Sequence, residues 1–227
     1  MASSDPTRQS PHPRVFVDVD VQRDFCEETG ALYVKGSPNA LFRRLTAHAV
    51  ARGIPIVGSV DSHAWDAWEF GSNDTPAPEG EKPGFPDHCV KGTPGWLKVE
   101  GTLPPRFRFL PNVAEAPIDA AVRELATGKT HAVYFEKEVY SLFANPLAEG
   151  FLRDLAAALG GAPELVVYGV ATDYCVRAAA LGLVQRGYRT TVLTDAVAGI
   201  TEAGVAAALA EMRAAGVTLA TSSAVLG

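Results

Sequence analysis

The stretch VYGVATDYCVRAAALGLVQRGY, residues 167–188, joins a strand pattern to a helix pattern. Its β-branched, apolar start is typical of a buried strand, and its alanine- and leucine-rich end is typical of an amphipathic helix. Cys175 lies between the two, where we expect the first turn of the helix. There the helix dipole lowers the pKa of a thiol, and unpaired backbone N–H groups can bind an oxyanion. A lone cysteine at such a place is more often part of the core, so this stretch alone does not identify a nucleophile.

Strand patterns alternate with helix patterns along most of the chain. The strand patterns occupy residues 14–25, 54–61, 131–137, 164–171, 189–196 and 217–223. The helix patterns occupy residues 37–53, 116–127, 147–159, 173–187 and 202–215. This alternation predicts βαβ units, a parallel sheet and one α/β domain over residues 14–227. Ligands of such sheets bind at the carboxyl ends of the strands, which here carry Asp20, Asp61, Lys137 and the 170–175 turn.

The composition excludes several classes of protein. The chain has 227 residues, 47% of them hydrophobic, which suffices for a sizeable core. Its net charge is −6 and it has no run of basic residues, so we expect no nucleic-acid partner. No apolar run reaches the ~18 residues of a membrane span, and the three cysteines form no CxxC pair. We therefore expect a soluble, cytoplasmic protein without a membrane partner, with a disordered tail at residues 1–13.

The segment 62–113 interrupts the alternation and is rich in glycine, proline and tryptophan. A connection of this length without secondary structure is uncommon unless it is functional. Asp61 and His63 stand at its start and His88 lies within it, which gives the oxygen and nitrogen donors typical of metal sites. Glu69 and Glu81 are carboxylates that could extend this set. Histidines that are simply exposed in a loop are an equally weighted alternative.

Two charged residues at strand ends could act with Cys175. Asp20 could accept the proton of a thiol, although a carboxylate there could also cap a loop or pair with an arginine. Lys137 could stabilise the charged forms of both groups. Its neighbours Glu136 and Glu138, however, make an exposed lysine the simpler interpretation of the sequence.

Aromatic residues and one more aspartate complete the set of candidates. The loop contains the large side chains of Trp65, Trp68, Phe85 and Trp96. They either pack the loop onto its own core or form the walls of a site for a flat aromatic substrate. We interpret Asp24 as structural, because an aspartate at that position can bind N–H groups of a loop.

Several stretches together resemble one family, the nicotinamidase and isochorismatase-like cysteine hydrolases. They are DVQRDF (20–25), DSH (61–63), FPDHCVKGTPG (85–95), FEKEVYS (135–141) and GVATDYCVRAAALGLVQRGY (169–188), and TDAVAG (194–199) continues the likeness. The resemblance implies a three-layer α/β/α fold with a central parallel sheet and a catalytic triad of Asp20, Lys137 and Cys175. It also implies a cis peptide bond between Val170 and Ala171, with the N–H groups of Ala171 and Cys175 directed at one oxyanion.

The metal motif resembles the nicotinamidase branch of this family. By that resemblance Asp61, His63 and His88 would bind one divalent metal ion, which we expect to be zinc, with iron or manganese as alternatives. Glu81 has the spacing of a further ligand in some members of the family. We prefer it to Glu69, which stands where other members have a histidine.

The resemblance implies an amidohydrolase that converts nicotinamide and water to nicotinate and ammonia through a thioester. The rings of Phe25 and Phe85 would enclose the substrate ring, with Val170 beside it. The stretch 97–130 is longer than we expect for the family and leaves the exact amide open. A metal-independent amidase of a small carbamoyl or ureido substrate and a catalytically silent binding protein are the alternatives. By resemblance we also expect a homo-oligomer, either a dimer or a tetramer, whose partner is a small-molecule amide.

Overall fold

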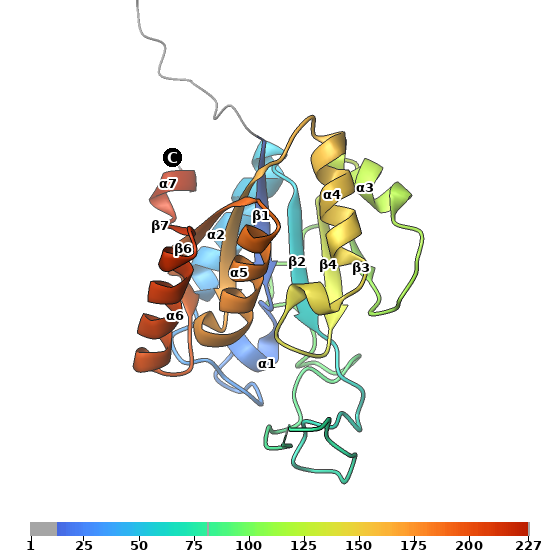
Figure 1. Ribbon diagram of the computed structural model, residues 1–227, viewed down its shortest axis with the longest axis vertical. Coiled ribbons are helices and arrows are strands. Elements are labelled where there is room, and N and C mark those ends of the chain that lie inside the picture. Colours follow the sequence, from blue (N-terminus) through green and yellow to red (C-terminus); the bar gives the residue numbers. More distant parts are fainter. Residues whose placement is uncertain (1–12, 81, 227) are drawn as a thin grey trace, which may run out of the picture.

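A seven-stranded sheet forms the middle layer of the protein in our computed structural model, which describes residues 13–80 and 82–226 (Figure 1). Neighbouring strands are all parallel. In order across the sheet they are β3 (Phe107–Leu110), β4 (Ala132–Lys137), β2 (Ile56–Asp61), β1 (Arg14–Val19), β5 (Glu164–Val170), β6 (Arg189–Ala198) and β7 (Thr218–Ala220). The first four strands of the chain form one half of the sheet, with β1 innermost, and the last three form the other half, with β5 innermost. The topological switch point, where sheets of this kind bind ligands, therefore lies between β1 and β5.

Helices cover both faces of the sheet (Figure 1). One face is covered by α3 (Asp119–Ala126), α4 (Ala148–Ala158), α5 (Arg177–Gln185) and α6 (Glu202–Ala214), and the other by α2 (Asn39–Arg52). Four shorter elements complete the structure: α1 (Arg23–Cys26), η1 (Leu142–Ala144), η2 (Thr172–Val176) and α7 (Ser223–Leu226). This arrangement confirms the predicted three-layer α/β/α fold with a central parallel sheet.

The central strand β1 is buried on both faces, which explains its nearly continuous apolar sequence. Val15, Val17 and Val19 belong to the core beneath α3 to α6, and Phe16 belongs to the core beneath α2. Because side chains alternate along a strand, Asp18 shares the face of Phe16, and it is completely buried. A carboxylate at this depth requires a partner for its charge.

Two differences from the predicted elements concern the site. Strand β3 lies inside the segment 62–113, which we expect from the sequence to be irregular. The stretch FRFL does not stand out as a strand pattern, because it has four residues, two of them exposed, and has prolines close to both ends. The predicted helix 173–187 is divided in two. Its start belongs to the π-helical turn η2, and the α-helix proper, α5, begins only at Arg177.

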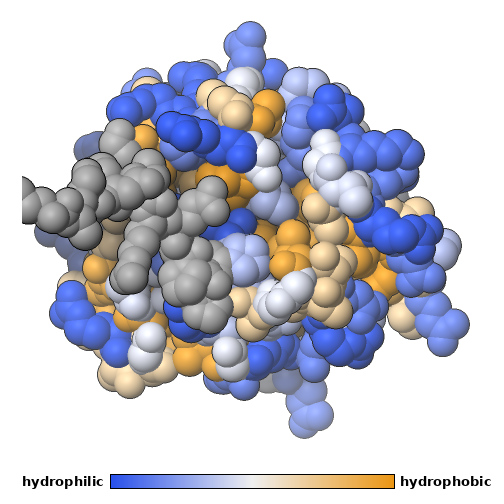
Figure 2. Space-filling view, turned by 90° about the horizontal axis from the view of Figure 1, so that it is seen from above, coloured by the Kyte–Doolittle hydropathy of each residue, from blue (hydrophilic) through white to orange (hydrophobic). Residues whose placement is uncertain are grey.

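Other predictions concern the ends of the chain and its surroundings. The disordered tail predicted at residues 1–13 lies, except for Pro13, outside the described residues. In residues 13–80 and 82–226 no helix is both long and apolar enough to cross a membrane. One sheet runs through the described chain, while the extent of a single domain over residues 14–227 stays a prediction. Figure 2 shows the amino ends of the strands, where hydrophilic side chains surround apolar ones; the candidate site lies at the opposite end.

Candidate active site

The carboxyl ends of four neighbouring strands bring the predicted catalytic residues together. Asp20 follows β1, Asp61 ends β2, Lys137 ends β4, and Cys175 follows β5 in η2. Asp20 has a left-handed backbone conformation, with a φ of 49°, which aspartate tolerates better than most residues. Because β4, β2, β1 and β5 are adjacent, residues far apart in the sequence meet in one buried region.

Lys137 contacts both other members of the predicted triad. Its Nζ atom lies 2.9 Å from Oδ2 of Asp20 and 3.7 Å from Sγ of Cys175. It also forms an ion pair with Asp61. Lys137 and Asp20 are completely buried and Cys175 is almost so. This burial excludes the exposed lysine that the flanking glutamates suggested.

The charges of this group depend on burial and on Lys137. Burial raises the pKa of the Asp20 carboxyl, and the ammonium of Lys137 opposes this rise. Burial would raise the pKa of Asp61 as well, but Lys137 and His63 more than offset it and lower the pKa to about 2. Burial alone would lower the pKa of Lys137, yet the two carboxylates raise it well above its ordinary value. Lys137 is therefore a permanent cation between two carboxyl groups.

The thiol of Cys175 differs from our expectation. Burial raises its pKa well above the ordinary value, Lys137 opposes this, and the charges of Asp20 and Asp61 add to it. The lowering by a helix dipole that we predicted is wrong, because Cys175 lies buried in the π-helical turn and not in the first turn of α5. The thiol is thus protonated at neutral pH, and a base has to take its proton when it attacks.

The turn that carries Cys175 has the backbone that the resemblance implied. The peptide bond between Val170 and Ala171 is cis. Ala171 directly precedes η2, and both Ala171 and Cys175 line one cavity. The binding of an oxyanion by their N–H groups stays a prediction.

A cluster of metal-ligand side chains lies beside the triad. One potential ligand atom each from Asp61, His63 and His88 lies within 4.8 Å of the others, and all three residues are buried. His88 turns its Nδ1 to the carbonyl oxygen of Pro86 at 2.8 Å, which leaves Nε2 for the cluster. Burial lowers the pKa of His88, so its imidazole is neutral and can bind a metal. Within the described residues Nδ1 of His63 has no hydrogen bond, and its Nε2 faces the carboxylates of Asp61 and Glu69. These donors fit a divalent metal ion.

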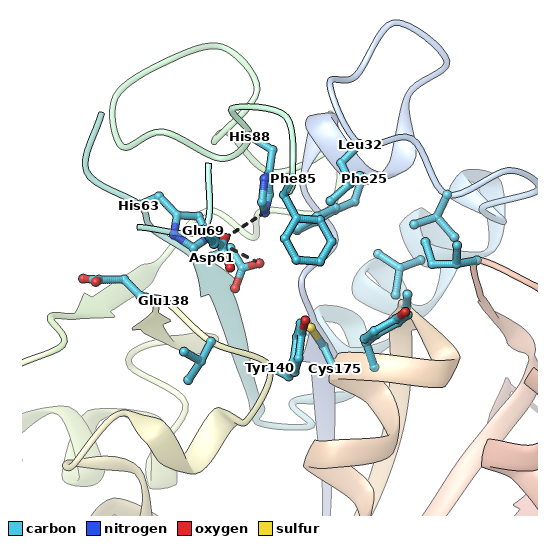
Figure 3. Close-up of a pocket in the computed structure, with 16 residues that line it drawn as sticks. Phe25, Leu32, Asp61, His63, Glu69, Phe85, His88, Glu138, Tyr140 and Cys175 are labelled. Carbon is cyan, nitrogen blue, oxygen red and sulfur yellow. Dashed lines mark ion pairs between the residues drawn. The ribbon is translucent and has the colours of Figure 1, made fainter. Parts of the chain in front are cut away.

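Glu69 is the carboxylate that the structure brings to this cluster. Its Oε1 atom lies 3.0 Å from Nε2 of His63 and 3.5 Å from Nε2 of His88 (Figure 3). The loop folds back on itself here, because the N–H group of Phe85 donates to the carbonyl oxygen of Glu69. We had preferred Glu81, which lies outside the described residues, so its role stays a prediction. The six-residue spacing from His63 was the signal that pointed to Glu69.

One cavity of about 120 Å³ joins the metal-ligand cluster to Cys175 (Figure 3). Phe25, Phe85 and Val170 line it, and the ring of Phe85 points into the space between the cluster and Cys175. Of the four large loop aromatics considered above, Phe85 is the one that lines the cavity. Sequence reasoning gave no role to four partly exposed side chains that line it, although the first three stand in stretches that carry the resemblance: Val139, Tyr140, Tyr174 and Ile200.

Asp24 is a structural anchor, as we interpreted it. Its Oδ1 atom accepts a hydrogen bond from the N–H group of Ala31 at 3.1 Å, and its Oδ2 atom accepts one from Cys89 at 2.7 Å. Cys89 directly follows His88 in the chain. Asp24 therefore fixes the backbone beside a predicted metal ligand.

Comparisons with known proteins agree with this geometry. A model of the isochorismatase domain matches residues 14–224. A nicotinamidase/pyrazinamidase of Mycobacterium tuberculosis (strain ATCC 25618 / H37Rv) is 34% identical over 212 residues, which cover 92% of this chain and 100% of that protein. A nicotinamidase of Escherichia coli (strain K12) is 30% identical over 232 residues, which cover 92% of this chain and 95% of that protein.

A solved structure extends the likeness to three dimensions. The pyrazinamidase of Pyrococcus horikoshii, crystallised in complex with zinc, superposes with a TM-score of 0.67 at 27% identity. The superposition covers 92% of this chain and 98% of that one. Sequence and fold thus agree over nearly the whole length of the protein. The chain belongs to the isochorismatase family, and within it to the nicotinamidase branch.

Proposed function

We propose that this protein is a metal-dependent nicotinamidase, which hydrolyses nicotinamide to nicotinate and ammonia through a thioester on Cys175. The observation that carries the proposal is one cavity that reaches both the thiol, with Lys137 3.7 Å from its sulfur, and the cluster of Asp61, His63 and His88. A nucleophile and a place to hold a heteroaromatic ring are thus available to the same small molecule. The two relatives named above, each a nicotinamidase by name, support the choice of substrate.

The first half of the reaction forms the thioester. Asp20 takes the proton of the Cys175 thiol while the sulfur attacks the amide carbon. The N–H groups of Ala171 and Cys175 stabilise the oxyanion of the tetrahedral intermediate. Asp20 then gives its proton to the amide nitrogen, the C–N bond breaks, and ammonia leaves. Lys137 stays charged throughout and stabilises the carboxylate of Asp20 and the sulfur when each is negative.

The second half of the reaction releases the acid. Asp20 takes a proton from water, whose oxygen attacks the thioester carbon. The C–S bond breaks, and the proton held by Asp20 returns to the sulfur of Cys175. The acid leaves and gives its own proton to water or to ammonia, which yields nicotinate. The chain thus ends the cycle in the state in which it began, with a protonated thiol.

We propose Asp61, His63, His88 and Glu69 as the residues that hold the metal ion. When bound, the ion would act as a Lewis acid toward the ring nitrogen of the substrate and so would orient the ring. Imidazole and carboxylate ligands suit zinc first, and iron or manganese as well. Phe25, Phe85 and Val170 would enclose the substrate ring. A metal-independent amidase would have no use for this buried cluster, which argues against that alternative. The assembled group of Asp20, Lys137 and Cys175 argues against a catalytically silent binding protein.

The test is ammonia release from nicotinamide by the full, zinc-loaded chain. We expect turnover in the wild type and a loss of about 10⁴-fold or more in Cys175→Ala. Cys26→Ala, which removes a buried thiol from outside the site, should retain turnover. Equal activity in Cys175→Ala would overturn the mechanism. Full activity after removal of all metal by a chelator would favour the metal-independent amidase.

The proposed reaction supplies nicotinate from nicotinamide and so belongs to the salvage of NAD. We expect the protein to work in the cytoplasm, where its three free, buried cysteines would remain reduced. Assembly as a dimer or tetramer, and the absence of nucleic-acid and membrane partners, stay predictions. The mass of the protein in solution, measured by light scattering, tests the first of these.

A further inference from the structure

A second buried ion pair lies outside the proposed catalytic site. The Nζ atom of Lys98 is 2.6 Å from Oδ1 of Asp18, and the side chains of the two residues are 2% and 0% exposed. Neither residue lines the cavity that holds Cys175. Asp18 belongs to the central strand β1, whereas Lys98 comes from the long loop that carries His63 and His88. The pair therefore joins that loop directly to the middle of the sheet.

Residues on one face of the sheet surround the ammonium group of Lys98. Strand register places Tyr134, Gly58, Asp18 and Tyr168 in one row across four adjacent strands. Gly58 has no side chain, and this leaves room for the ring of Tyr134. A Cβ atom at Gly58 would lie only 2.8 Å from Cδ1 of that ring. The ring of Tyr134 lies beneath Lys98, whose Nζ is 4.7 Å from the ring centroid. Apolar residues can often replace such a buried pair without loss of stability, so a role in positioning is the hypothesis to test.

Lys98 sits in a short segment, residues 95–99, that pairs with the chain just after β1. The N–H group of Val99 donates to the carbonyl oxygen of Val21 at 3.1 Å, and that of Arg23 donates to Leu97 at 2.9 Å. Gln22 and Lys98 face each other in this antiparallel pairing. The position of the 95–99 segment thus sets the surroundings of Gln22.

Gln22 connects the 95–99 segment to Asp61. Its side-chain amide donates to the carbonyl oxygens of Trp96 and Asp61, each at 2.9 Å, and its Oε1 accepts from the N–H group of Asp61 at 2.8 Å. The indole of Trp96 also donates to the hydroxyl of Ser62 at 2.6 Å. The backbone N–H and carbonyl groups of Asp61 and the side chain of Ser62 are therefore connected, through Gln22 and Trp96, to the 95–99 segment.

Asp24 connects the same segment to His88. The N–H group of Asp24 donates to the carbonyl oxygen of Gly95 at 3.1 Å. The Asp24 carboxylate in turn accepts the N–H group of Cys89, the residue that follows His88. Two of the proposed metal ligands thus depend on where residues 95–99 lie.

We propose that the Asp18–Lys98 pair fixes the 95–99 segment on the sheet and so sets the positions of Asp61 and His88 before any metal binds. Both residues act as positioning residues, through Gln22 and Asp24, and neither touches the substrate. The effect that we expect on metal binding rests on the proposed metal site. Its structural part concerns the metal-free protein alone.

The test compares three variants of the full chain with the wild type. Lys98→Met removes the cation, Asp18→Val with Lys98→Met replaces the pair by apolar side chains, and Leu155→Ala serves as a control. Leu155 is completely buried in α4, on the other face of the sheet, so its truncation lowers stability without touching the loop. Hydrogen exchange of the Val99 and Asp61 amides is measured in the metal-free proteins. Zinc affinity is then measured by competition with a chromogenic chelator.

We expect these two amides to exchange about tenfold faster or more in both Lys98 variants, and zinc to bind about 10- to 100-fold more weakly. The double variant should fold even if Lys98→Met does not, because it leaves no unpaired buried charge. Wild-type exchange at both amides in the double variant would overturn the proposal. So would unchanged zinc affinity in that variant, or equal effects of Leu155→Ala on both readouts. If the wild type binds no zinc, the proposed function fails, and amide exchange alone decides this inference.

Discussion

Asp61 forms an ion pair with Lys137 and at the same time lies in the cluster of His63 and His88. One carboxylate therefore belongs both to the surroundings of the proposed catalytic lysine and to the proposed metal site. Lys137 completes the connection, since it also pairs with Asp20 and approaches Cys175. A change of charge on Asp61 or Lys137 will affect the nucleophile and the metal site together.

Lys137→Met should destabilise the protein by about 3–5 kcal/mol at neutral pH, because it leaves two buried carboxylates without their cation. Arg153→Met is the control, since Arg153 pairs with Asp154 at the surface, with side chains 73% and 40% exposed. Loss of that exposed pair should change the free energy of unfolding by about 1 kcal/mol or less. Urea unfolding of both variants measures the difference. Similar losses in the two variants would contradict the assignment of Lys137 as the charge partner of Asp20 and Asp61.

The same variant should reverse the sign of the contribution that Asp61 makes to the pH dependence of stability in acid. In the wild type the pKa of Asp61 is lowered to about 2 from 3.8, so its contribution is complete above pH 3.8 and is lost as the pH falls toward 2. Burial already raises the pKa of Asp20 in the wild type, against the charge of Lys137. Without Lys137 that pKa rises further, and the pKa of Asp61 also rises above its ordinary value. The folded state then binds more protons than the unfolded state, so the stability of Lys137→Met should rise as the pH falls from 7 toward 3.8. Unfolding measured across this range gives the sign directly, and parallel curves for the two proteins would refute it.

Glu69→Gln should weaken zinc binding about tenfold or more, because it removes the carboxylate that lies against His63 and His88. Glu81→Gln is the direct comparison, since both glutamates have a spacing that suits a ligand. Glu79→Gln, in the same loop and exposed, serves as a control for charge. Chelator competition gives the three affinities. If Glu81→Gln has the large effect and Glu69→Gln has none, our original preference for Glu81 is correct.

Asp24→Asn should destabilise the loop and weaken zinc binding. Each carboxylate oxygen of Asp24 accepts one backbone N–H group, and asparagine can accept only one of them. The cost is about 1–3 kcal/mol where the N–H group of Cys89, which is buried, is left unpaired, and smaller where it is that of Ala31, which is exposed. Asp87→Asn is the matched control, because Asp87 is exposed and accepts from the hydroxyl of Ser72. Thermal unfolding of both variants decides, and an Asp24→Asn protein as stable as the control would show that the anchor is dispensable.

Gly58→Ala should destabilise the protein by about 1–3 kcal/mol, the usual range for overpacking of a core. A Cβ atom at Gly58 would lie 2.3 Å from the carbonyl oxygen of Asp18 as well as against the ring of Tyr134. Gly84→Ala should be tolerated, because nothing lies within 4 Å of a Cβ atom there. The free energies of unfolding of the two variants should differ clearly. Equal values would mean that both the backbone of Asp18 and the ring of Tyr134 can move aside, and would weaken the view that their positions are fixed.

The sequence predicted the triad because one local rule brings its members together. Asp20, Lys137 and Cys175 each stand at or just after the carboxyl end of a strand pattern, and parallel strands place those ends at one edge. Recognising the individual strands was therefore enough to bring these residues near one another. The resemblance then supplied the roles that the pattern alone left open.

What the sequence could not predict depends on contacts between distant segments. The approach of Glu69 to His63 and His88 follows from the pairing of Phe70 with Phe85, which residue spacing does not encode. The partner of Asp18 lies 80 residues away in an irregular loop. The raised pKa of the Cys175 thiol follows from its burial, whereas the start of a helix alone suggested the opposite sign.

The order of the strands has a consequence for how the protein reaches its active form. Asp20, Asp61 and Lys137 come from three strands separated by long stretches of chain, so none of these charges finds its counter-charge locally. A partly folded chain that has assembled β1 and β2 but not β4 would bury two carboxylates without an ammonium group. Such an intermediate is strongly disfavoured, which ties the central strands into one cooperative unit. The charges that we assign to catalysis thereby also act against incomplete folding.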